Sequence, residues 1–195
     1  MTNIALFVSG SQATSTDKNT SNSFMFPPAL DPLPIATNSA LIKISGNSSK
    51  NMTVELYIND DLIDKKSVDN NGNFVFDYQL TPGDSLIKVR NDNDNKKSDF
   101  SPIVTVSYKN AAPNLTIDSP SDGQKFSNDQ RDITVSGKTD PGVTVTVNGF
   151  WAIIDQNNNY SYNLTLINGD NSIKVDATDQ AGNKAEKTIK VNYSE

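Results

Sequence analysis

The side chains of this sequence that could bind a ligand or carry out chemistry are acidic, amide and aromatic groups, because the 195 residues include no histidine and no cysteine. The chain therefore lacks the commonest general base and transition-metal ligand, and it has neither a thiol nucleophile nor a disulfide. Carboxylates that lie close together in the sequence fall in predicted turns, where nothing would dehydrate them for acid–base catalysis. We therefore expect a protein that is not an enzyme, with no catalytic residue and no bound cofactor.

A calcium ion could still be held by the oxygen-rich turns, because calcium is a hard cation that prefers carboxylate and amide oxygens. The candidate ligands are Asp84, Asp140 and Asp179, which are all expected where the two halves of the chain meet. The alternative is that these aspartates only close tight turns, for which no metal is needed.

Trp151, the single tryptophan, is the strongest candidate for contact with a partner. Ile154 should face the core, and strict alternation then turns Phe150 and Ala152 inward as well. The same alternation turns Trp151 and Ile153 outward. An exposed tryptophan beside an exposed isoleucine could form a ligand platform or anchor another protein. The alternative is a tryptophan that covers a sheet edge or a domain junction.

An internal repeat indicates that the chain contains two copies of one domain. Residues 69–80 match residues 155–166 at a constant offset, and the same offset relates 83–89 to 169–175. Within each copy the apolar residues recur with a period of two, which is typical of half-buried strands. The residues on these alternating faces are Phe74, Phe76, Tyr78 and Leu80 in the first copy and Tyr160, Tyr162, Leu164 and Leu166 in the second.

Turn signals separate several further short strands in each copy. Asn148-Gly149 follows an apolar run and predicts a two-residue hairpin turn, in which both central residues need a positive φ. No amphipathic helix of useful length is found. Short strands at this regular spacing predict an all-β protein built from antiparallel β-sandwiches.

Three stretches of the second copy form a recognisable set: IDSPSDG at 117–123, VSGKTDPGVTVTVNG at 135–149 and ATDQAGN at 177–183. Together they resemble the bacterial immunoglobulin-like domains of surface proteins, close to the glucodextranase domain-B type. The first copy is a divergent version of the same pattern. The resemblance covers about residues 35–195 and implies two tandem immunoglobulin-like antiparallel β-sandwiches. It also implies adhesion or stalk roles in a membrane-anchored bacterial cell-surface protein, without catalysis.

Composition divides the chain into three parts. Residues 1–30 are predicted to be a disordered linker that is rich in serine, threonine and asparagine and becomes proline-rich. Its apolar run at 4–8 is either a tag-like start or the end of a truncated membrane anchor, and no window is long enough for a membrane span. Residues 31–109 form the first predicted immunoglobulin-like domain, and residues 110–195 form the second.

The charge balance bears on the expected partners. With 17 basic and 23 acidic residues the net charge is −6, which opposes binding to a nucleic-acid backbone. We expect an extracellular monomer whose only link to a membrane is an anchor absent from, or truncated in, this chain. Its partner is predicted to be a surface glycan or a protein. Two functions remain open: a non-catalytic stalk or adhesion module, and a carbohydrate-binding module that uses Trp151.

Overall fold

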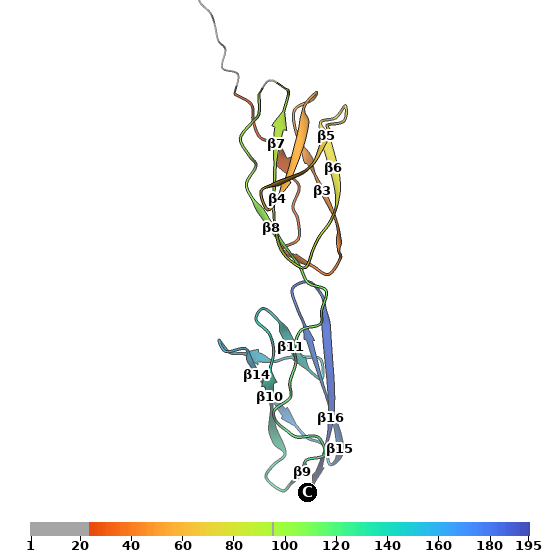
Figure 1. The fold of residues 1–195 in the computed structure, drawn as a ribbon. Coiled ribbons are helices and arrows are strands. Elements are labelled where there is room, and N and C mark those ends of the chain that lie inside the picture. The colour runs from red at the N-terminus through yellow and green to blue at the C-terminus, as the bar shows by residue number, and fades with distance from the viewer. Residues whose placement is uncertain (1–23, 95) are drawn as a thin grey trace, which may run out of the picture.

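The computed structural model describes residues 24–94 and 96–195, which form two β-sandwiches placed end to end (Figure 1). Each sandwich has a hydrophobic core of its own, and the two cores share no residue. The predicted all-β fold of two tandem sandwiches is confirmed, and none of the described residues forms a helix long and apolar enough to cross a membrane. Residues 1–23 of the predicted linker, including the apolar run at 4–8, lie outside the described residues.

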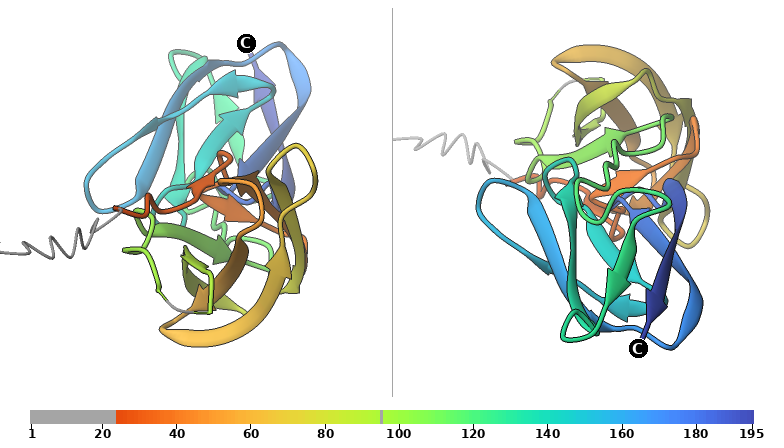
Figure 2. Two further views of the ribbon diagram at one scale, coloured as in Figure 1. Left: turned by 90° about the horizontal axis from the view of Figure 1, so that it is seen from above. Right: turned by 90° about the horizontal axis from the view of Figure 1, so that it is seen from below.

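The first sandwich has eight strands in the described part of the chain, arranged in two sheets that face each other (Figure 2). The three-stranded sheet has the order β1 (Ala29–Leu30), β3 (Leu41–Asn47) and β6 (Asn73–Gln79). The five-stranded sheet has the order β2 (Ala36–Thr37), β8 (Val104–Tyr108), β7 (Gly83–Asp92), β4 (Thr53–Ile58) and β5 (Asp61–Ser67). Neighbouring strands are antiparallel except β2, which runs parallel to β8.

The second sandwich also has a three-stranded and a five-stranded sheet, but its edge strands differ. Its three-stranded sheet has the order β10 (Asp132–Lys138), β14 (Asn159–Thr165) and β13 (Ile153–Ile154). Its five-stranded sheet has the order β12 (Phe150–Trp151), β11 (Thr144–Val147), β15 (Gly169–Thr178), β16 (Lys184–Ser194) and β9 (Lys125–Ser127). The predicted turn at Asn148-Gly149 joins β11 to β12, with φ values of 49° and 85°.

The first sandwich begins earlier in the chain than the predicted boundary at residue 31. Ala29 and Leu30 form β1, which pairs with the end of β3, and Leu30 packs against the first core. The side-chain amide of Asn91 also donates a hydrogen bond to the carbonyl of Phe26 at 2.9 Å. Residues 24–30 therefore belong with the first sandwich, because long-range pairing orders a segment whose composition suggests a linker.

The two copies close the same open side in different ways. In the second copy the chain leaves β12, crosses to the other sheet, and pairs as β13 with the edge of β14. In the first copy β5 stays beside β4 over its whole length. There the ammonium of Lys66 on β5 donates to the carbonyl of Val75 on β6 at 2.8 Å, and this contact covers the edge that no strand occupies.

A glycine at matching positions of β3 and β10 lets the segment that begins each sandwich run close beside that strand. A Cβ atom added at Gly46 would collide with the carbonyl oxygen of Ala29, and one added at Gly137 with that of Thr116. The hydroxyl of Tyr160 donates to the same Thr116 carbonyl at 2.7 Å, so this segment is held in place. Only glycine leaves room for the backbone of these neighbouring segments at Ala29 and Thr116.

We predict that Gly137→Ala destabilises the protein by about 1–3 kcal/mol, because backbone atoms would have to move to accommodate the methyl group. The measurement is the unfolding midpoint in urea followed by circular dichroism. Ser136→Ala is the matched control, since the Ser136 side chain makes no hydrogen bond within the described residues and should leave the midpoint unchanged. Equal midpoints for Gly137→Ala and the wild type would contradict the close approach.

Candidate functional site

A groove lies on one side of the second sandwich, where the chain passes between its two sheets. Trp151 ends β12 and is paired with Thr146 of β11, whereas Ile153 begins β13 and is paired with Ser161 of β14. Ala152 alone connects the two strands, and its N–H donates to the carbonyl of Val145 at 3.0 Å. One residue of separation therefore brings side chains from both sheets together.

The exposure of these residues agrees with the predicted alternation only in part. Trp151 is 71% exposed and Ile153 is 77% exposed, and both point outward as predicted. The prediction that Phe150 faces inward was wrong, because Phe150 is 63% exposed. Its ring stacks on that of Tyr162, with centroids 6.2 Å apart and planes 12° apart. Alternation assumes one continuous strand, and here the strand ends after two residues.

The groove has a volume of about 280 Å³ and is uncharged. It is lined by Trp151, Ile153, Ser161, Tyr162 and Asn163, so no lysine, arginine, aspartate or glutamate lines it. Ser161 and Asn163 lie two residues apart and therefore share one face of β14. The Asn163 side-chain oxygen accepts a hydrogen bond from the Thr134 hydroxyl at 3.0 Å. An apolar platform thus lies beside hydroxyl and amide groups.

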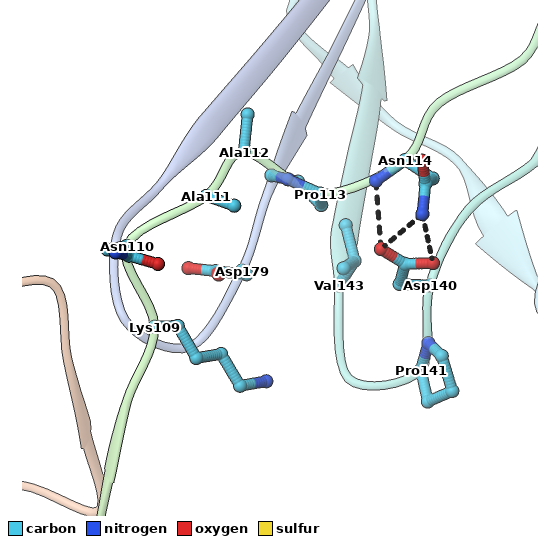
Figure 3. A pocket seen from close by; sticks show the side chains of 10 residues that line it. All are labelled: Lys109, Asn110, Ala111, Ala112, Pro113, Asn114, Asp140, Pro141, Val143 and Asp179. Atoms are coloured by element: carbon cyan, nitrogen blue, oxygen red, sulfur yellow. Dashed lines mark hydrogen bonds between the residues drawn. The ribbon is translucent and has the colours of Figure 1, made fainter. Parts of the chain in front are cut away.

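A second cavity, of about 410 Å³, lies at the junction of the two sandwiches (Figure 3). The linker Lys109–Pro113 forms one side, and Asp140 and Asp179 of the second sandwich lie on the other. The Asp140 carboxylate accepts hydrogen bonds from the backbone N–H of Asn114 at 2.8 Å and from its side-chain amide. Both kinds of hydrogen bond lower the pKa of Asp140, and the backbone bond contributes more than the side-chain bonds.

The loop that begins at Asp179 is one of three loops with the same internal bonding. In each loop the opening aspartate accepts from the backbone N–H groups two and four residues later at 2.8–2.9 Å. The closing asparagine donates its side-chain amide back to the aspartate. The three aspartate–asparagine pairs are Asp69 with Asn73, Asp155 with Asn159, and Asp179 with Asn183.

Asn183 does one thing that its two counterparts do not. Its side-chain amide also donates to the carbonyl of Lys109 in the linker, at 3.0 Å. Within the described residues, the side-chain amides of Asn73 and Asn159 bond only inside their own loops. Burial by itself would raise the pKa of Asp179, but the hydrogen bonds from Asn183 and Ala181 outweigh it and lower the pKa. The third loop therefore connects the second sandwich to the linker.

The three aspartates predicted as calcium ligands are not gathered in one place. Asp140 and Asp179 both line the junction cavity, but Asp84 is not among its lining residues and lies on β7 opposite Ser107. In residues 24–94 and 96–195 no three acidic side chains come together as a group that could hold a metal ion. Calcium binding by Asp84, Asp140 and Asp179 stays a prediction.

Sequence reasoning missed a buried carboxylate on the outer face of the first sandwich. Glu55 alternates with core residues on β4 and should be exposed, yet its side chain is fully buried. Its oxygens lie 2.6 Å from the ammonium of Lys65, 2.8 Å from that of Lys97 and 2.7 Å from Nε of Arg90. The Tyr57 hydroxyl donates to it at 3.0 Å.

The cations around Glu55 determine its protonation. Burial by itself would raise the pKa of Glu55, but hydrogen bonds from Lys65, Lys97 and Arg90 hold it far below its ordinary value of 4.5. The Arg90 guanidinium also lies 4.9 Å from the ring centroid of Phe100, in the segment that follows β7. A covering segment that is distant in sequence therefore creates this site, and no local signal marks it.

A family model described as "Glucodextranase, domain B" matches residues 113–194. The second sandwich is similar to glucodextranase domain B. That match spans nearly all of the second predicted domain and includes Trp151, Asp179 and Asn183. The resemblance inferred from the sequence motifs is therefore supported for this half of the chain.

One relative and one solved structure extend the comparison to both sandwiches. Bacillopeptidase F of Bacillus subtilis (strain 168) is 33% identical over 159 residues, which is 80% of this chain and 11% of that protein. The chain thus spans about a tenth of this relative's length. The solved fibronectin(III)-like modules of Clostridium thermocellum CbhA superpose with a TM-score of 0.52 at 18% identity, covering 86% of this chain and 94% of that one. This likeness shows the fold.

We predict that Glu55→Gln destabilises the first sandwich by about 3 kcal/mol, because three cations would lose their buried partner. Chemical unfolding at neutral pH measures the change. Asp77→Asn is the control, since it removes an ion pair with Lys43 in which both side chains are mostly exposed, and it should change the midpoint little. The pH dependence follows from the lowered pKa: the contribution is present above about pH 4.5 and is lost as the pH falls below it. The difference between wild type and Glu55→Gln should therefore shrink in acid, and a constant difference would contradict the assignment.

Proposed function

We propose that this chain is a non-catalytic module of a cell-surface protein, in which two rigidly joined sandwiches space and present binding surfaces outside the cell. Support comes from the end-to-end arrangement, in which the described chain begins at one end of the molecule and its C-terminus lies at the other (Figure 1). A seven-residue strand covers about 23 Å, so each sandwich adds a few nanometres of length. The extracellular location rests on the resemblance to domains of surface proteins.

The observation that carries this proposal is the way the linker is held. The carbonyl of Lys109 accepts from Asn183 at one end, and Asn114 donates to Asp140 just beyond the other. Between them Pro113 restricts its own backbone and that of the preceding alanine. Both of these bonds attach the linker to the second sandwich, and the N–H of Lys109 donates to the carbonyl of Thr37 in the first sandwich at 3.0 Å. The linker is therefore bonded to both sandwiches, which limits hinge motion as a spacer requires.

The loop that holds the linker also reaches the first sandwich. A Cβ atom added at Gly182, in the loop closed by Asn183, would lie 3.8 Å from the side-chain amide nitrogen of Asn38. Asn38 follows β2, whose Thr37 is paired with Tyr108 directly before the linker. One loop of the second sandwich therefore bonds to the linker and lies close to the first sandwich, which favours a single preferred orientation of the two.

A second candidate function is carbohydrate binding by the groove at Trp151. The observation that favours it is the exposed indole beside the hydroxyl of Ser161 and the amide of Asn163. Aromatic faces pack against the apolar face of a sugar ring, while hydroxyl and amide groups bond to the sugar's hydroxyls. A spacer that carries such a groove would act as an adhesion module.

We predict that Asn183→Ala loosens the junction while Asn159→Ala does not, because only Asn183 bonds to the linker. Each variant loses the loop hydrogen bond to its own aspartate, worth about 1 kcal/mol, and only Asn183→Ala also loses the bond to the Lys109 carbonyl. Since the chain has no cysteine, spin labels at Asp64→Cys and Ser127→Cys report the distance between the sandwiches by pulsed electron paramagnetic resonance. The distance distribution should be narrow in wild type and Asn159→Ala and broad in Asn183→Ala. A broad distribution in the wild type would overturn the spacer proposal.

We predict that Trp151→Ala weakens glycan binding at least tenfold, since truncating a central exposed tryptophan removes about 2 kcal/mol of binding energy. A glycan array selects the ligand, and titration calorimetry gives the ratio of the two affinities. Ile167→Ala is the control, because Ile167 is a large exposed side chain that does not line the groove. Binding that is indifferent to Trp151→Ala would rule out this candidate function.

A further inference from the structure

We infer that the groove at Trp151 takes an uncharged pyranoside, and that Asn163 supplies the polar contact that orients it. This inference rests on carbohydrate binding as the function of the groove. It goes further by naming the chemical class of the sugar and the hydrogen-bonded pair, Thr134 and Asn163, that selects it. Three features support this inference: the charge of the groove lining, the exposed hydrogen-bonding groups, and the contrast with the first sandwich.

The charge of the groove and of the chain favours a neutral sugar. No lysine or arginine lines the groove to pair with a carboxylate or sulfate group. The chain as a whole carries a net charge of −6, which repels anionic glycans. Trp151 and Ile153 instead offer an apolar surface. A sugar ring without charge loses less hydration free energy than a charged one when it binds to such a surface.

The hydrogen-bonding groups of the groove are exposed to solvent, and one of them is held by a neighbouring side chain. The Thr134 hydroxyl on β10 donates to the side-chain oxygen of Asn163, which leaves the two N–H donors of the amide for another partner. Within the described residues, neither the Asn163 side-chain nitrogen nor the Ser161 hydroxyl has a hydrogen-bond partner. A sugar hydroxyl can accept from the first and pair with the second. A volume of about 280 Å³ suits one ring rather than a long chain.

The first sandwich shows the same face without this chemistry. Thr134 is directly opposite Asn163 in the second sandwich, and Lys43 is directly opposite Asp77 at the matching place in the first. The Lys43–Asp77 pair is an ion pair at 3.1 Å, whereas the Thr134–Asn163 pair is neutral. The fold therefore accommodates either pair. Only the neutral pair lies beside an exposed tryptophan.

The experiment transplants the charged pair of the first sandwich into the second. The double variant Thr134→Lys, Asn163→Asp should fold, since the first copy carries that pair, and should bind neutral sugars at least tenfold more weakly. The reciprocal variant Lys43→Thr, Asp77→Asn is the control and should bind as the wild type does. If the first double variant has a lowered unfolding midpoint, Ser161→Val, which installs the matching residue Val75, provides a second variant and should also weaken binding.

The probes are methyl pyranosides of glucose, galactose, mannose and N-acetylglucosamine, compared with the uronates of glucose and galactose. Binding is followed through the indole N–H signal of Trp151 in nitrogen-15 spectra, which is unique because the chain has one tryptophan. We expect at least one neutral sugar to shift this signal and each uronate to bind at least tenfold more weakly than its neutral counterpart. Equal or tighter uronate binding would overturn the inference while leaving carbohydrate binding intact. If no sugar binds, both are overturned.

Discussion

Burial of one alternating strand face in each sandwich is the constraint on which the rest of this chain depends. Phe76 on β6 and Tyr160 on β14 are almost completely buried, and each strand is paired over seven residues with its neighbour in the three-stranded sheet. A slip of one residue would move the whole apolar face into water, so the register of each pair is strongly specified. The same register fixes which residues face outward. The cores keep the two copies alike, and the outer faces are free to differ.

The two copies differ most where one side of the sandwich would otherwise expose a strand edge. In the first copy the Lys66 ammonium covers this edge, and a lysine at a sheet edge disfavours pairing with another chain. The second copy covers it with a strand that changes sheets, and this crossing leaves Trp151 and Ile153 exposed side by side. A solution to the edge problem thereby produces a surface suited to a ligand. The two copies also differ in the charge of their outer faces. The first copy carries the buried Glu55 with its cations, and the second carries the uncharged groove.

The junction uses a loop that the fold already contains. Three loops share one pattern of aspartate and asparagine hydrogen bonds, and in each the residue before the closing asparagine has a positive φ. In two of them the pattern only reverses the chain. In the third the closing asparagine faces the linker and bonds to the Lys109 carbonyl as well. The third loop therefore connects the second sandwich to the linker because of where it lies, with the same internal hydrogen bonds as the other two loops.

The sequence by itself determined the alternating strands at 74–80 and 160–166, the repeat, the turn at Asn148-Gly149 and the outward direction of Trp151, because each depends on side chains that are near one another in the chain. Tertiary structure decided the rest. The pairing of β1 with β3, the burial of Glu55 under Arg90 and Lys97, and the bond from Asn183 to Lys109 all join residues far apart in sequence. Phe150 was misjudged for the same reason, since the point where a strand leaves one sheet for another depends on which edges are free in the folded molecule. Local periodicity describes a strand, and only the assembled sheets show where that strand must end.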